Sequence, residues 1–266
     1  MKFTVFGASG FIGSNLVARL TEAGYEVEAP SKGVMPSPKV NLGHVVYAIG
    51  LTGDFRTRPF DTVDAHVTYL RDLLATARFE SFLYLSSTRI YGAAQDFVSE
   101  SDSINLMVKP DSLYDLSKML GEALCLSCGR DGMRIARLAN VYGDGQSENT
   151  FLGSILSKVS RGKTVVIDES PDSGKDYVSI DDTVEMLLHI ATQGREQIYN
   201  VASGAITTHE MIAGLLNTHC DGLVSFRTGA KKRRLPLIGI ERIKAECRVN
   251  PRSLIDDLPD LLHRKM

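Results

Sequence analysis

A tyrosine and a lysine in a helix-like stretch, Tyr114 and Lys118, are four positions apart. Residues with this spacing lie on one face of a helix, so the phenol and the ammonium become neighbours. A free phenol has a pKa of ~10, but a nearby ammonium favours the phenolate. Tyr114 would then exchange a proton with a substrate hydroxyl. Such a pair also occurs on ordinary surfaces, so the other motifs decide between the two interpretations.

Three glycines, Gly7, Gly10 and Gly13, follow a short apolar strand and open an amphipathic helix. The first permits a tight turn, the second lets the backbone approach phosphate oxygens, and the third lets the helix pack on the strand. The helix N-terminus adds free N–H groups and a favourable dipole. We expect a dinucleotide pyrophosphate here, and a plain strand-to-helix turn is the alternative. The expected cofactor-binding residues of this turn are Gly7, Ser9, Gly10, Phe11, Ile12 and Gly13.

The adenosine end of the expected cofactor site falls after the second strand. An acidic residue at that strand tip is typical of NAD sites, and a cation is typical of NADP sites. Glu28 is one residue inside the tip, and Ser31 and Lys32 follow it. Ser31 and Lys32 can contact a 2′-phosphate, whereas Lys32 as a solvated loop charge is the alternative. The expected cofactor is NAD or NADP, with a small preference for NADP.

Three further segments accompany the tyrosine–lysine pair: YLSSTRIYG at 84–92, RLANVYG at 137–143 and KDYVSIDD at 175–182. Together with GASGFIG at 7–13, their order and spacing resemble the extended short-chain dehydrogenase/reductases. The closer likeness is to the branch of sugar-nucleotide epimerases, dehydratases and reductases. The resemblance covers nearly the whole chain, and the joint pattern is highly specific.

The resemblance implies a role for each matching residue. Ser87 matches the residue that hydrogen-bonds the reacting hydroxyl or carbonyl oxygen, and Tyr114 matches the acid/base. Lys118 matches the lysine that binds the nicotinamide ribose and lowers the pKa of the tyrosine. Asn140 matches an asparagine that contacts the nucleotide-sugar, and Lys175 stands where an arginine often faces the diphosphate. The expected catalytic residues are Ser87, Tyr114 and Lys118, and the expected substrate-binding residues are Ser87, Thr88, Asn140 and Lys175.

The chain also departs from the family pattern. Thr88 and Arg89 stand where the 4,6-dehydratases of this branch carry an Asp-Glu pair, so the groups for water elimination are missing. A standard dehydratase is therefore not expected. His66 and Tyr69 replace the usual asparagine and glycine of the preceding helix. His66 could relay protons, although a packed or hydrogen-bonded histidine is the favoured interpretation.

Strands and helices alternate along the chain, which predicts an α/β fold with a Rossmann-type doubly wound parallel sheet. We expect residues 1–143 plus 174–201 to form the NAD(P)-binding domain, and 144–173 plus 202–266 the smaller, C-terminal substrate-binding lobe. Residues 30–43 hold three prolines and two glycines. A loop is therefore expected in place of the usual helix and strand, which leaves a trimmed sheet. Expected strands are 3–6, 26–29, 44–49, 82–85, 133–138, 177–180 and 198–201, and expected helices after the glycine turn are 61–78, 113–128, 151–160, 181–192 and 208–217.

Composition points to a small-molecule enzyme. The 266 residues are 43% hydrophobic and carry a formal charge of -2, so neither a nucleic acid nor a membrane surface is an expected partner. The chain shows neither an apolar run of the ~20 residues that cross a bilayer nor a signal-peptide pattern, so we expect a cytoplasmic protein. Cys125 and Cys128 form one CxxC pair inside a helical stretch, so reduced buried thiols are expected and no metal is.

The expected function is hydride transfer at a carbon of a nucleotide-activated sugar, as an epimerase or a keto-sugar reductase. The same residues serve both reactions, and the sequence does not separate them. Reduction of a carbonyl compound without a nucleotide, or dinucleotide binding without turnover, are the alternatives. The basic run Lys231–Arg234 either holds a diphosphate or is a solvated face. A homodimer through helices 61–78 and 113–128 is a further possibility that the resemblance suggests.

Overall fold

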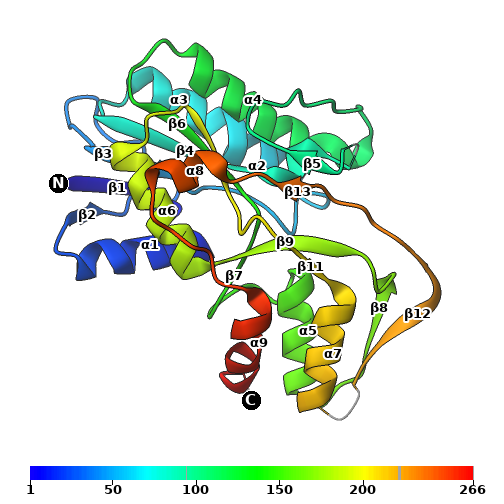
Figure 1. Ribbon diagram of the computed structural model, residues 1–266. Coiled ribbons are helices and arrows are strands. Elements are labelled where there is room, and N and C mark those ends of the chain that lie inside the picture. The colour runs from blue at the N-terminus through cyan, green and yellow to red at the C-terminus, as the bar shows by residue number, and fades with distance from the viewer. Residues whose placement is uncertain (94, 221–222, 266) are drawn as a thin grey trace.

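A twisted parallel sheet forms the centre of the molecule (Figure 1). Over residues 1–93, 95–220 and 223–265, which the computed structural model describes, this sheet has six strands. Their order confirms the predicted Rossmann-type sheet. In sheet order the strands are β2 (Glu26–Glu28), β1 (Lys2–Phe6), β3 (His44–Tyr47), β4 (Ser81–Ser87), β6 (Met133–Leu138) and β10 (Ile198–Val201).

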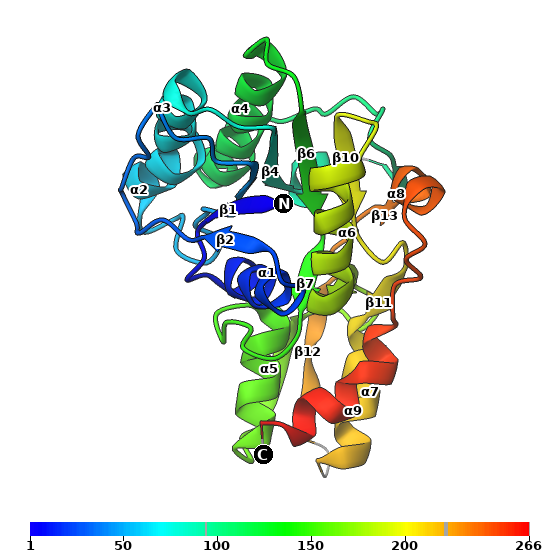
Figure 2. The same cartoon turned by 90° about the vertical axis from the view of Figure 1, so that its left-hand side faces the viewer.

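Helices cover both faces of this sheet (Figures 1 and 2). α1 (Phe11–Glu22) and α6 (Ile180–Gln193) lie on one face, and α2 (Pro59–Val63), α3 (Tyr69–Thr76) and α4 (Leu113–Ser127) lie on the other. A strand covered on both faces buries successive side chains rather than alternate ones. The central strands are apolar runs because both of their faces are buried. In β4, for example, all residues but the last are buried.

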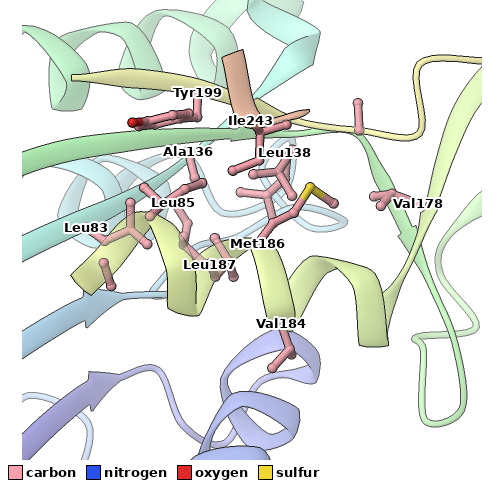
Figure 3. Packing of buried hydrophobic residues seen from close by; sticks show 14 of the residues in the cluster. Leu83, Leu85, Ala136, Leu138, Val178, Val184, Met186, Leu187, Tyr199 and Ile243 are labelled. Carbon is pink, nitrogen blue, oxygen red and sulfur yellow. The ribbon is translucent and has the colours of Figure 1, made fainter. Parts of the chain in front are cut away.

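The largest hydrophobic core lies between the sheet and α6 (Figure 3). Leu83 and Leu85 of β4 lie beside Ala136 and Leu138 of β6, and all four belong to this core. Their alternation along each strand places them on one face of the sheet. Val184, Met186 and Leu187 of α6 belong to the same core.

The trimmed edge predicted for the sheet is present. β2 is three residues long and pairs with β1 at the margin of the sheet. Residues 30–43 then pass to β3 through turns, without a helix or strand in this described segment. Hydrogen bonds fasten this loop to the rest of the chain: the Tyr69 hydroxyl donates to the Val34 carbonyl at 2.6 Å, and the Thr4 hydroxyl donates to the Leu42 carbonyl at 2.7 Å.

The helix predicted over 61–78 is wrong in its bounds and its regularity. Pro59 begins α2, since proline fits the first turn of a helix, where its missing N–H is not needed. A π-helical turn then spans Asp64–Thr68, and α3 ends at Thr76 because Ala77 is extended. The wider turn contains His66, whose side chain is fully buried. Local π-turns often occur at functional sites.

A second hydrophobic core lies below the sheet in the view of Figure 1. Its helices are α5 (Phe151–Ser160), α7 (His209–His219) and α9 (Leu254–His263), and its strands are β8 (Val165–Glu169) and β12 (Val224–Lys231), which pair in parallel. A sheet of three strands connects this region with the rest: β7 (Asn140–Tyr142) pairs with β9 (Gly174–Ser179), and β9 pairs with β11 (Ile206–Thr208). The domain boundaries given above remain a prediction.

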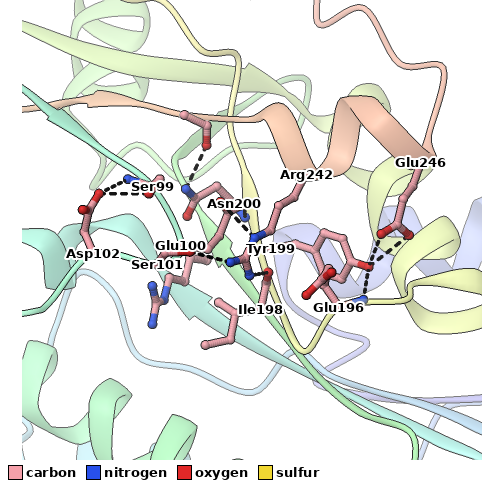
Figure 4. Close-up of polar contacts among 12 residues, drawn as sticks. Ser99, Glu100, Ser101, Asp102, Glu196, Ile198, Tyr199, Asn200, Arg242 and Glu246 are labelled. Atoms are coloured by element: carbon pink, nitrogen blue, oxygen red, sulfur yellow. Dashed lines mark hydrogen bonds and ion pairs between the residues drawn. The ribbon is translucent and has the colours of Figure 1, made fainter.

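The C-terminal segment returns to the edge of the central sheet through α8 (Glu241–Glu246) (Figure 4). Arg242 donates to the Ile198 carbonyl of β10 at 3.1 Å, and its Nε lies 3.7 Å from a Glu100 oxygen. Glu100 also accepts from the Asn200 backbone N–H at 2.8 Å. The short pair β5 (Phe97–Val98) and β13 (Leu237–Ile238) lies beside this contact. Among the described residues, we find no helix long and apolar enough to span a bilayer.

Candidate active site

The glycine turn lies at the point where the strand order reverses. β1 is followed by α1 on one face, and the chain then crosses β1 to form β3 on its other side. Ligands of open α/β sheets bind at the carboxyl ends of strands at such a point. A Cβ on Gly7, whose φ is +84°, would lie 2.8 Å from the Ala48 carbonyl carbon beyond β3. The turn therefore packs directly against the neighbouring strand.

The start of α1 fits a dinucleotide. A Cβ on Gly13 would lie 2.2 Å from the Gly7 carbonyl oxygen, so the helix approaches the turn as closely as glycine alone permits. Gly10 is the N-cap of α1 and provides no side-chain hydrogen bond, and Ser9 and Gly10 are exposed. The amides that open a helix have no partner inside the helix. Those of Phe11, Ile12 and Gly13 can therefore hold a pyrophosphate.

Ser87, Tyr114 and Lys118 lie together at the carboxyl end of β4. Ser87 is the last residue of β4, and Tyr114 is the second residue of α4, which packs on that strand. The Ser87 side chain lies near the Tyr114 phenol and lowers the pKa of that phenol by hydrogen bonding, although burial raises it more. Lys118 Nζ donates to the Leu85 carbonyl at 2.8 Å and lies 5.0 Å from the Tyr84 ring centre. The structure thus brings the three expected catalytic residues to one place.

Burial dominates the electrostatics of this group. It raises the pKa of Tyr114, while the hydrogen bond from Ser87 and the charge of Arg89 lower that pKa. Burial also lowers the pKa of Lys118 to about 7, against an opposing attraction to Glu122. A buried lysine with this pKa is partly neutral at physiological pH. A bound anion or hydroxyl group at Lys118 would favour its charged form.

His66 connects this site with α4 by hydrogen bonds. Its Nε2 accepts from the Leu51 backbone N–H at 3.2 Å, so Nδ1 carries the proton and donates to Ser117 Oγ at 2.8 Å. Ser117 Oγ in turn donates to the Tyr114 carbonyl at 2.9 Å. Burial and the Lys118 charge lower the pKa of His66 to about 2. The ring is therefore neutral, and this geometry supports the hydrogen-bonded structural role rather than proton relay.

Three residues that lie near Tyr114 were not placed there from the sequence: Thr52, Phe55 and Arg89. Thr52 also lowers the pKa of the Tyr114 phenol by hydrogen bonding, although burial raises it more. Phe55 is 2% exposed, and its ring centre lies 5.5 Å from that of Tyr114. The Arg89 guanidinium lies over both rings. A signal for Thr52 was present, because it follows β3 at the same edge of the sheet as Ser87, but nothing in the spacing identified Phe55.

The expected substrate-binding residues are divided between two places. Thr88 Oγ1 donates to the Leu138 carbonyl at 3.3 Å, next to Ser87. Asn140 Nδ2 donates to the Asp176 carbonyl at 2.9 Å, which ties β7 to β9. Lys175 points toward the second core, with Nζ 4.1 Å from the Phe151 ring centre. Burial lowers the pKa of Lys175 to about 8.

The basic segment after β12 is partly paired. Lys232 lies 2.6 Å from Asp172, and Arg233 lies 3.4 Å from Glu169. The charge of Arg233 lowers the pKa of Lys175, although burial is the larger cause. Burial raises the pKa of Asp115. The charges of Arg89 and Lys109 lower that pKa, and the charge of Arg233 lowers it to a smaller extent. Arg233 is therefore close enough to act on both Lys175 and the residue beside Tyr114.

The remaining expected cofactor contacts, Ser31 and Lys32, are exposed in the loop that follows β2. That loop leaves the carboxyl end of β2, the edge at which the glycine turn also lies. Across the part of the chain that the structure describes, we find no cluster of three acidic, histidine or cysteine side chains suited to a metal.

The family model of the NAD dependent epimerase/dehydratase family matches residues 3–58 and 37–202. A dTDP-glucose 4,6-dehydratase of Streptomyces griseus is 27% identical over 141 residues, which cover 51% of this chain and 42% of that protein. The aligned part thus spans less than half of that relative. An ADP-L-glycero-D-manno-heptose-6-epimerase of Nitratidesulfovibrio vulgaris is 27% identical over 253 residues, which cover 77% of each chain.

Solved structures of low sequence identity share the fold. MoeE5 in complex with UDP-glucose and NAD has a TM-score of 0.82 at 20% identity, with 99% of this chain and 98% of that chain covered. RMD from Pseudomonas aeruginosa, complexed with NADPH, has a TM-score of 0.81 at 20% identity, with 100% of this chain and 99% of that chain covered. The fold therefore extends over the whole of this chain, including the second core.

Proposed function

Because the chain belongs to the NAD-dependent epimerase/dehydratase family, we propose that it transfers hydride at a carbon of a nucleotide-activated sugar, as an epimerase or a keto-sugar reductase. The observation that carries this proposal is the convergence of Ser87, Tyr114 and Lys118 at the carboxyl end of β4. The glycine turn fits a dinucleotide at the same edge of the sheet. Similar proteins whose structures hold NAD or NADPH support a nicotinamide cofactor.

A nicotinamide bound at the glycine turn would supply hydride transfer to and from the sugar carbon. Tyr114 accepts the hydroxyl proton of the sugar as the carbon–hydrogen bond breaks, and it returns the proton when the carbonyl is reduced. Ser87 donates a hydrogen bond to the reacting oxygen and orients it. Lys118 binds the nicotinamide ribose, and its charge favours the phenolate. Epimerisation differs from net reduction in one respect: the keto sugar rotates within the site and is reduced again on its other face before it leaves.

Elimination of water is not part of the proposal. It needs one group that takes a proton from carbon and another that gives a proton to the leaving hydroxyl. The positions after Ser87 hold Thr88, whose hydroxyl donates to the Leu138 carbonyl, and Arg89, whose guanidinium pairs with Asp115. Neither side chain supplies a carboxyl group.

The choice of cofactor and the place of the sugar complete the proposal. Ser31 and Lys32 lie exposed after β2, where a 2′-phosphate of NADP would meet a hydroxyl and a cation. This favours NADP over NAD. Asn140 and Lys175 lead from the catalytic edge to the second core, and the nucleotide of the substrate would bind along them.

Replacing Tyr114 with phenylalanine tests the proposal. The change removes one oxygen from a ring that is otherwise held in place by Phe55 and Arg89. We expect turnover, measured as a change in NAD(P)H absorbance with a panel of nucleotide-sugars, to fall by orders of magnitude. Cofactor affinity should remain nearly unchanged. Tyr25→Phe serves as the control. It removes the same group from a tyrosine that directly precedes β2, at the amino end of the strand and away from the carboxyl edge of the sheet. Unchanged turnover in Tyr114→Phe would remove this residue from the mechanism.

A further inference from the structure

We propose that Arg89 is a positioning residue that stabilises the phenolate of Tyr114, a task that Lys118 shares but does not perform alone. The inference rests on the proposed function, in which Tyr114 is the acid/base. Arg89 is one of the two residues that stand where the 4,6-dehydratases carry an Asp-Glu pair, so the proposal assigns a chemical role to this replacement.

The contacts of Arg89 fix its guanidinium over the tyrosine. Its Cζ lies 5.2 Å from the ring centre of Tyr114 and 4.9 Å from that of Phe55. Its Nε lies 2.9 Å from an Asp115 oxygen, and its backbone N–H donates to Ser87 Oγ at 3.3 Å. A cation over an aromatic ring is attracted by the ring face, and the attraction grows when the ring itself becomes an anion. The arrangement therefore favours the ionised phenol.

Arg89 supplies the guanidinium that lies over the Tyr114 ring. Lys118 loses much of its charge near neutral pH, because burial lowers its pKa to about 7. His66, whose ring centre lies 5.3 Å from that of Tyr114, is neutral for the same reason. An arginine keeps its proton under all these conditions. The titratable and charged groups near Tyr114 are Arg89 on the turn after β4, His66 on the π-turn, Tyr84 on β4, and Asp115 and Lys118 on α4.

Asp115 opposes Arg89 and supplies a matched control. Its carboxylate pairs with the guanidinium, and its negative charge raises the pKa of Tyr114, although burial raises it more. Arg89→Gln and Asp115→Asn therefore break the same ion pair and remove charges of opposite sign. A purely structural effect of losing the pair would be common to both variants, whereas an electrostatic effect would reverse its direction.

The test is a titration of Tyr114 in the full-length protein with NADP⁺ added. All nine tyrosines are replaced biosynthetically with 3,5-difluorotyrosine, whose lower pKa brings ionisation into the range where the protein stays folded. Fluorine NMR follows each ring against pH, and Tyr114→Phe identifies the signal by its loss. We expect the midpoint to rise in Arg89→Gln, to fall in Asp115→Asn, and to stay near the native value in Arg89→Lys.

Midpoints that move in the same direction in Arg89→Gln and Asp115→Asn, or that do not move at all, would overturn the inference. The titration needs no substrate, so its result is separate from the fate of the proposed function. If Tyr114→Phe turned over normally while the two midpoints diverged, the electrostatic coupling would stand and the catalytic assignment would fall. If Tyr114→Phe lost turnover while the midpoints stayed fixed in both charge variants, the catalytic assignment of Tyr114 would stand and the role of Arg89 would fall.

Discussion

The buried ion pair between Glu122 of α4 and Arg137 of β6 holds the helix that carries Tyr114 and Lys118. Arg137 Nη2 lies 2.7 Å from Glu122 Oε2, and the two side chains are 5% and 6% exposed. Arg137 Nη1 also donates to the Tyr91 hydroxyl at 2.9 Å. Although burial lowers the pKa of Arg137, its hydrogen bond and attraction to Glu122 raise it. Glu122→Gln removes the charge but keeps the shape of the side chain.

The size of the effect follows from burial. Removing one partner of a buried pair leaves an uncompensated charge and costs ~3–5 kcal/mol. Glutamine still accepts one hydrogen bond from Arg137, so we expect a loss near ~3 kcal/mol. A change of 1 kcal/mol shifts the melting temperature of a chain of this size by ~2–4 °C. Glu122→Gln should therefore melt roughly 6–12 °C below the native protein.

The assay is thermal and urea unfolding followed by circular dichroism, without cofactor. Glu148→Gln is the control, because Glu148 makes an ion pair with Arg161 of similar length, 2.9 Å, while both side chains are more than half exposed. Exposed pairs of this kind contribute little, so its melting temperature should stay within error of the native value. Equal losses in the two variants would refute the reasoning that burial, rather than the pair itself, sets the cost.

Two further predictions concern the cofactor turn and Lys118. Gly13→Ala places a Cβ 2.2 Å from the Gly7 carbonyl oxygen, so NAD(P) binding measured by calorimetry should be lost, and retained binding would argue against this turn as the cofactor site. Gly214→Ala meets nothing within 4 Å in α7, so it should leave binding unchanged and raise the unfolding free energy by roughly 0.5–1 kcal/mol. Burial lowers the pKa of Lys118 to about 7 in the folded chain, while the unfolded chain keeps a lysine protonated to ~10.4. The unfolded state thus binds more protons between these values, so stability in urea without cofactor should rise with pH from about 7 to 10. This rise should be smaller in Lys118→Met, and an unchanged slope would contradict it.

Much of the central sheet could be predicted because its signals are local. β4 and β6 are apolar runs buried on both faces, and the glycines after β1 mark one turn. The proline-rich segment 30–43 correctly predicted a missing helix and strand. The bounds were less accurate: the strand predicted over 44–49 ends at Tyr47, and the strand predicted over 177–180 begins at Gly174.

The second core was harder to predict because its order comes from distant partners. β8 has an alternating pattern of buried and exposed residues, but its partner β12 follows some sixty positions later. α9 contains Pro259, which usually interrupts a helix, yet its leucines still reach the core. The surroundings of Tyr114 were missed for the same reason. Phe55 and Arg89 are brought to the ring by the tertiary structure, not by any spacing in the chain.

The face of α4 that lies against the sheet is unusually polar, and each polar residue on it has a partner that fixes the rotation of the helix. Ser117 bonds with His66, Lys118 with the Leu85 carbonyl, and Glu122 with Arg137. Between them, Gly121 leaves room for the Tyr84 hydroxyl, which a Cβ would meet at 2.3 Å. Burying such groups costs free energy unless all are satisfied, so a slight rotation or shift of α4 would leave several without partners at once. Tyr114 is on the same helix, so the contacts that stabilise α4 also set the position of the phenol beside Ser87.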